Sequence, residues 1–318
     1  MHCGKASKIT SSTFYNLWKL TVYRVLVFAL AIGMGAAIVL PAIRYVLESR
    51  ELDFLLTTVK NLGQSVIHGE DLSAYGPAIQ DGVKDFGALI LSKKGNIALV
   101  FLGVVVALFF GEFLKGLSSF TYGNAVNDYM STMSNQGFFR CFFRQLPRAV
   151  MYQLVQTVLK TVYAVITLIA MLYTFIGLVP HLQVLTLGLV YVIAIVMFAL
   201  YYTVMNGFMP AIVVDKKSVG SSLKSSFAQL RGKKHFFSLF GTYVVSLVVC
   251  EALFVLFGFL TFGIGFLVLP TVISMYFTAL SFVFYYHFTD RKFYLDYDHI
   301  VIPKALRKEE SLLNEMDV

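Results

Sequence analysis

The sequence predicts an all-α, polytopic membrane protein with six transmembrane helices and cytoplasmic amphipathic helices at the membrane interface. Of its 318 residues, 58% are hydrophobic and only 14% are charged, whereas soluble globular chains carry about 25% charged residues. Six segments are also apolar and long enough to cross a bilayer, which takes about 20 residues per helix. We therefore expect a single transmembrane domain over residues 1–318.

The predicted spans cover residues 19–46, 96–118, 149–178, 184–209, 235–260 and 266–288. Residues 161–214 contain no Asp, Glu, Lys or Arg and are too many for one helix, so the Gly and Pro of GLVPHLQ (177–183) predict a turn. TFGIGF (261–266) predicts another. The segment 47–95 and the tail 289–318 remain outside the spans.

The distribution of Lys and Arg predicts the orientation. The N-terminal flank and the loops at 119–148 and 210–234 are basic, whereas the turns near 180 and 263 contain no Lys or Arg. Basic residues in short flanks favour the cytoplasmic side of a membrane. We therefore expect a multi-pass plasma-membrane protein with both termini in the cytoplasm and residues 47–95 outside.

The first basic segment, GFFRCFFRQLPRAV (137–150), combines arginines with phenylalanines. Arg140, Arg144 and Arg148 recur every four residues and so share one side of a helix. Pro147 is expected to end or kink this helix, because proline removes a backbone donor. We expect an interfacial helix whose arginines face anionic lipid.

The second basic segment lies within residues 210–234. Val219, Leu223, Phe227 and Leu230 recur at helical spacing and predict one apolar face. Basic side chains cover much of the rest, namely Lys216, Lys217, Lys224 and Arg231. This pattern is typical of a helix in the headgroup layer, with anionic membrane lipids as its partners.

The outside segment is expected to form two amphipathic helices, because apolar residues share one helical face at 52–62 and again at 79–90. These helices could cap the bundle, bind a partner or lie on the membrane surface. The intervening loop contains His68, Glu70 and Asp71, which could bind a metal ion but are more simply explained as a solvated surface. We expect no metal.

Three ionisable residues fall inside the spans: Lys160, Glu251 and Glu112. Such residues are costly in a bilayer and are candidates for function. Lys160 and Glu251 differ in predicted depth by only about 5 Å at about 1.5 Å per residue, so they could pair. Lys160 could instead reach Glu112. A structural ion pair and a substrate or ion site both remain open.

Motifs for enzymatic chemistry are absent from the sequence. It has no HExxH, GxSxG, CxxC or phosphate-loop pattern. Cys3, Cys141 and Cys250 are scattered and predict neither a disulfide framework nor a zinc site. The basic residues flank spans, where topology already explains them, so nucleic acid is not an expected partner. We expect a protein that has no enzymatic activity and binds no cofactor.

The stretch MPAIVVDKKSVGSSLKSSFAQLRGKKHFFSLFGTYVV (209–245) resembles six-span bacterial proteins related to the membrane domain of glycerophosphoryl diester phosphodiesterases. In that pattern a span ends in Pro and is followed by an acidic-basic turn, a helix of the A-x-K-x-S kind and a new span. Ser225 and Ser226 occupy the small polar positions, while Ser222 replaces the more usual Ala. The catalytic barrel of those enzymes has no counterpart here, so the resemblance implies no hydrolase activity.

A fainter resemblance links Leu146 and Pro147 to the cytoplasmic loop of ABC-transporter permeases, but Ser134 stands at the glycine position and the EAA motif is missing. We expect a non-enzymatic bacterial membrane protein that engages lipid or supports an envelope process. The alternative is a transporter or permease subunit for a small or lipidic substrate. A cavity containing Glu251 and Lys160 would favour transport.

Overall fold

The computed structural model describes residues 2–68, 75–92, 94–134, 136–182, 184–230, 232–296 and 299–302. Nearly all of this part of the chain is helical, and six of its helices are long and apolar enough to cross a membrane. The all-α polytopic fold class is confirmed. Arg231, Glu70 and Asp71 lie outside the described residues, as does most of the tail at 289–318.

The chain divides into two compact units. The larger unit contains residues 1–26 and 113–318, and the smaller unit contains residues 27–112. Helices α2 (Leu17–Leu47) and α5 (Lys94–Thr132) are each divided between the two units. The smaller unit is therefore inserted, in sequence, into the larger one.

Within the smaller unit, α2 and α5 approach closely at glycines. A Cβ atom on Gly103 would lie 2.7 Å from Val39 Cγ2, and one on Gly35 would lie 2.9 Å from Ala107 Cβ. Small residues at helix contacts are typical of membrane helices, because they allow backbones to come close together.

The segment 47–95 forms the two helices that the sequence predicts, α3 (Arg50–His68) and α4 (Tyr75–Ser92), which pack against each other. Leu55 occupies the space over Gly82, where a Cβ atom would lie 2.7 Å from Leu55 Cδ2. Leu56, Val59 and Val83 remain exposed. The hairpin thus keeps an apolar surface beyond its own helix contact.

Helix α11 (Ile264–Phe288) forms the centre of the larger unit, and its side chains Met275, Leu280, Phe282 and Phe284 are fully buried. Helix α10 (Lys233–Leu260) packs beside it. The turn between them is confirmed: Gly263 adopts a φ of 93°, and the backbone N–H of Gly265 donates to Thr261 Oγ1 at 2.7 Å. Glycine suits such a left-handed position because it has no Cβ atom.

The basic N-terminal flank forms a packed helix. Residues His2–Ser12 make up helix α1, which packs along α11. Ala6 and Ile9 are fully buried there. Lys8 Nζ lies 3.2 Å from a carboxylate oxygen of Asp296 in the short hairpin of β1 (Phe293–Asp296) and β2 (His299–Val301). The beginning of the chain is thus joined to a segment near its end.

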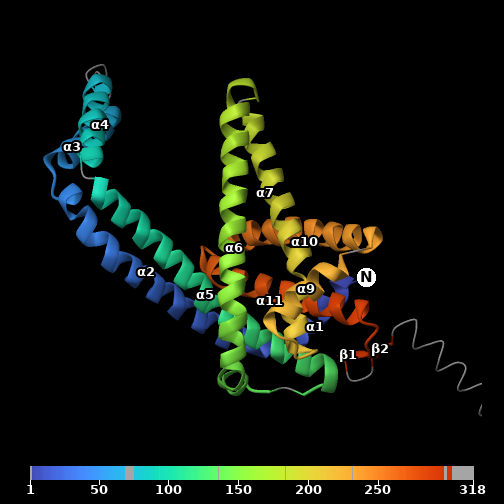
Figure 1. Ribbon diagram of the computed structural model, residues 1–318. Coiled ribbons are helices and arrows are strands. Elements are labelled where there is room, and N and C mark those ends of the chain that lie inside the picture. The colour runs from blue at the N-terminus through green and yellow to red at the C-terminus, as the bar shows by residue number, and fades with distance from the viewer. Residues whose placement is uncertain are drawn as a thin grey trace, which may run out of the picture. The chain divides into compact units, whose positions relative to one another are not determined.

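Helices α6 (Phe138–Leu182) and α7 (Val184–Met205) form a long hairpin, and α10 packs across α7 (Figure 1). Of the two outcomes expected at Pro147, an end or a kink, the helix end is not found, because α6 continues through Pro147 into the predicted third span. Pro147 removes only the hydrogen bond to the carbonyl of Phe143, whose side chain is exposed. The helix also extends further into 177–183 than expected, and Gln183 lies outside the described residues.

Candidate functional site

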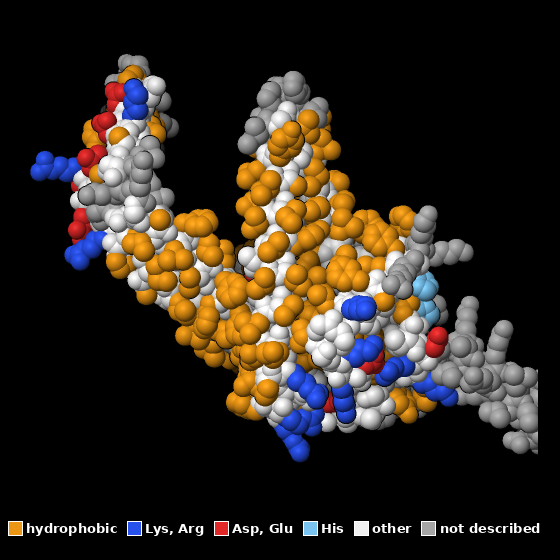
Figure 2. Space-filling view, in the orientation of Figure 1, with side chains coloured by type: hydrophobic (Ala, Val, Ile, Leu, Met, Phe, Trp, Pro, Cys, Tyr) orange, Lys and Arg blue, Asp and Glu red, His pale blue; other side chains and the backbone are white. Residues whose placement is uncertain are grey.

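The first candidate site is a basic surface at the beginning of α6. Arg140, Arg144 and Arg148 are all exposed, and so are Phe139 (60%) and Phe143 (69%) beside them. We call these five residues the arginine row. Figure 2 shows Lys and Arg side chains gathered at this end of α6 and near α9, while hydrophobic side chains cover α6 and α7. In the arginine row, cations therefore stand next to large exposed apolar side chains.

Three lysines of the second basic segment, Lys216, Lys217 and Lys224, differ in their contacts. Lys216 and Lys224 are exposed. Lys217 Nζ lies 2.9 Å from a carboxylate oxygen of Asp215 and donates to Ser225 Oγ at 3.3 Å. All three lysines are thus exposed, but Lys217 is held by Asp215 and Ser225.

Asp215 is a junction between the end of α8 (Phe208–Val213) and the end of α11. Besides Lys217, it accepts hydrogen bonds from Tyr285 OH and Arg291 Nη2, each at 2.6 Å. Burial raises the pKa of this carboxyl, but the hydrogen bonds from Tyr285 and Lys217 and the nearby charge of Arg291 outweigh burial and lower it overall. Asp215 thus stays ionised, and its bonds to Tyr285 and Arg291 hold the beginning of the second basic segment in place.

The predicted interfacial helix is α9 (Val219–Gln229), but its buried face differs from the prediction. Ser222 and Ser226 are the buried residues, while Phe227 is 51% exposed. Val219 and Leu223 pack against the protein core. Three of the four predicted apolar-face residues, Leu230 included, therefore contact protein, and Phe227 is the one open to the surroundings.

The buried face of α9 differs from the predicted one because the helical chain is interrupted between α7 and α8. Ser226 Oγ donates to the carbonyl of Val204 at 2.6 Å and accepts from the backbone N–H of Gly207 at 3.3 Å. Tyr243 OH donates to Asn206 Oδ1 at 2.6 Å. Backbone groups left free inside a protein require such partners. The serine face of α9 supplies them and is therefore turned inward.

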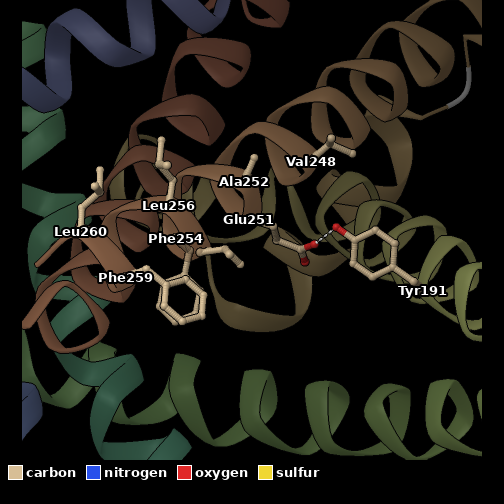
Figure 3. Close-up of a pocket in the computed structure, with 9 residues that line it drawn as sticks. Tyr191, Val248, Glu251, Ala252, Phe254, Leu256, Phe259 and Leu260 are labelled. Carbon is tan, nitrogen blue, oxygen red and sulfur yellow. Dashed lines mark hydrogen bonds between the residues drawn. The ribbon is translucent and has the colours of Figure 1, made fainter. Parts of the chain in front are cut away.

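The second candidate site is a groove of about 770 Å³ along α10, around Glu251. Tyr191 of α7 donates a short hydrogen bond to Glu251 Oε2, and the two side chains point toward each other in Figure 3. The rest of the lining is apolar and comes from residues 248–260. Phe259 is 74% exposed, so the groove opens onto the outer surface of the helices.

Of the three intramembrane charges, Glu251 alone lines this groove. Lys160 lies in α6 and Glu112 in α5, and both take part in polar or electrostatic interactions. Pairing of Lys160 with Glu251 or Glu112 stays a prediction. Tyr191 was not predicted as the partner of Glu251. The only signal in the sequence was that both residues lie at a similar distance from a predicted turn, Tyr191 after 177–183 and Glu251 before 261–266.

Within the described residues, no group of three His, Cys, Asp or Glu side chains is placed to hold a metal ion. Comparison with known proteins gives no match to a family model, to a curated protein or to a solved structure.

Proposed function

We propose that this integral membrane protein is a non-enzymatic plasma-membrane component that binds anionic lipid on its cytoplasmic side. The observation that carries the proposal is the arginine row, in which three exposed guanidinium groups stand beside two exposed phenylalanine rings. Phenylalanines of this kind insert at the boundary between headgroups and acyl chains, while arginines bind lipid phosphates. Lys216 and Lys224 add two exposed cations.

The positions of the basic residues along the chain support the cytoplasmic assignment. Lys and Arg next to spans favour the cytoplasmic side, and the cytoplasmic leaflet carries the anionic lipid that attracts them. A role in an envelope process and the kinship with phosphodiesterase membrane domains, suggested by 209–245, are parts of the same proposal.

The test is to count lipids retained by the purified protein in native mass spectrometry, after titration with phosphatidylglycerol or phosphatidylcholine. We expect preferential retention of phosphatidylglycerol. Changing Arg140, Arg144 and Arg148 together to Gln should reduce it by roughly 100-fold, because each basic residue at an anionic surface contributes about 1 kcal/mol.

The matched control changes Arg50, Lys60 and Lys84 to Gln. It removes the same charge from the outside segment and should leave retention unchanged. Equal retention of both lipids by the native protein, or an equal loss in both triple variants, would rule out a specific role for the arginine row.

The second candidate, a transporter or permease subunit, is favoured by the groove at Glu251. The lining of this groove is almost entirely apolar and does not include Lys160. It therefore supports binding of a hydrophobic molecule rather than passage of a polar one, and lipid binding remains the leading proposal.

A further inference from the structure

We infer that the groove along α10 is a binding site for a hydrophobic monocation, an alkylamine whose ammonium group pairs with Glu251. This site is separate from the arginine row and has the opposite charge preference. It therefore goes beyond the proposed function and does not depend on it.

The Glu251 carboxylate has hydrogen-bonding capacity that its neighbours do not fill. An ionised carboxylate has about four acceptor positions on its two oxygens, and within the described part of the chain it receives one hydrogen bond, from Tyr191. No Lys, Arg or His is among the described residues that line the groove. A carboxylate in apolar surroundings is costly unless it is paired. A ligand that brings its own positive charge would supply the missing partner.

Aromatic packing fixes the shape of the apolar wall of the groove. Phe254 and Phe259 line the groove, and both pack against Phe266, with ring centroids 5.0 and 6.2 Å away. A Cβ atom on Gly258 would lie 2.1 Å from the Phe266 ring, so this glycine makes room for the ring. The wall is thus preformed, and aromatic faces also attract cations. A volume of about 770 Å³ lies within the usual range for ligand pockets.

The depth of the groove along the helices favours an amine over a phospholipid. Glu251 lies about 14 Å along α10 from Leu260, and Tyr191 about 10 Å along α7 from Val184, at about 1.5 Å per residue. Both are therefore well inside the helices that could span the membrane. A phosphatidylethanolamine headgroup would bring a phosphate to this depth, where the lining offers no cation to neutralise it. A bare ammonium group on an alkyl chain avoids that cost.

The experiment uses the full chain in nanodiscs of phosphatidylcholine. It compares two photoreactive probes of equal length, an alkylamine and an alkyl alcohol, each with a diazirine in the chain. Cross-linked peptides are then mapped by mass spectrometry. We expect the amine to label residues 248–260 about tenfold more than the alcohol, as for a hydrogen bond to a charged group. Equal labelling by the two probes would overturn the inference.

Two substitutions test whether the Glu251 carboxylate causes the preference for the amine probe. Glu251→Gln should lower amine labelling to the level of the alcohol and leave alcohol labelling unchanged, whereas the matched control Glu48→Gln should alter neither. Persistence of the amine preference in Glu251→Gln would contradict the role of this carboxylate. If Glu251→Gln fails to fold, alcohol labelling will also disappear. The comparison of amine and alcohol labelling on the native protein then tests the inference. Competition by phosphatidylethanolamine as effective as that by the free amine would refute the choice of a bare amine.

Discussion

Two serines on the same face of α9 should respond in opposite ways to the same substitution. Ser222 and Ser226 are one helical turn apart, and their exposed fractions are 0% and 2%. Ser226 Oγ bonds two backbone groups at the break between α7 and α8. Ser222 Oγ is buried without a hydrogen-bond partner among the described residues. Burial, residue type and helix are thus matched, and only the hydrogen bonds differ.

Replacement of Ser226 by Ala leaves the carbonyl of Val204 and the N–H of Gly207 without this partner. An unsatisfied buried group costs about 1–3 kcal/mol. Because the contact to Gly207 is long, at 3.3 Å, we expect the free energy of unfolding to fall by about 2 kcal/mol. Replacement of Ser222 by Ala removes an unpaired hydroxyl and leaves a methyl group in its place. We expect it to raise the free energy of unfolding by about 1 kcal/mol.

The assay is denaturant unfolding of the purified protein in mixed micelles, followed by circular dichroism. Ser221→Ala, at an exposed position of the same helix, controls for helix propensity, since Ala favours helices by a few tenths of a kcal/mol relative to Ser. The prediction concerns the difference of about 3 kcal/mol between the two buried variants. If Ser222→Ala destabilises the protein as much as Ser226→Ala, the Ser222 hydroxyl has a partner and the hydrogen-bond argument is refuted.

Three other perturbations have defined outcomes. Gly265→Ala would place a Cβ atom 2.7 Å from a backbone carbonyl oxygen and should lower the melting temperature through a loss of about 1–3 kcal/mol, whereas Gly241→Ala, with open space around it, should be neutral or stabilising. Burial and neighbouring cationic groups lower the pKa of His2 to about 4; the unfolded chain then binds more protons, so stability should decline as pH falls from about 6.5 to about 4. In His2→Phe this pH-dependent part should be absent from melting curves, and an undiminished slope would assign it to another group. Single cysteines near Ser73 should react with impermeant thiol reagents from outside and those at Ser221 only from inside; external labelling at Ser221 would reverse the predicted orientation.

The spans were predictable because a bilayer requires continuous apolar segments whose backbone groups are satisfied internally. That requirement is local, so it can be recognised directly in the sequence, for example in residues 161–214, which contain no Asp, Glu, Lys or Arg. The two helices of 47–95 were predictable for a related reason, since helical periodicity is also a local signal.

Helix α1 was not predictable in this way. Its buried apolar residues, Ala6 and Ile9, are few, and they pack against α11, far away in the sequence. The pairing of Tyr191 with Glu251 depends on how two separate helices are rotated about their axes, which one sequence does not specify. For α9, periodicity correctly indicated a helix but not its buried face. The break at Asn206 decides that face through hydrogen bonds to Ser226.

The docking of α1 on α11 has a consequence for the order of events during synthesis. Ribosomes add about 5–20 residues per second, so α11 is completed roughly 15–55 s after α1. During that interval Ala6 and Ile9 lack the surface that buries them in the finished protein, and Lys8 lacks Asp296. Helix α1 therefore lacks its packing surface while the five spans that precede α11 are synthesised. It is made well before α11 but can reach its final position only after α11 is complete.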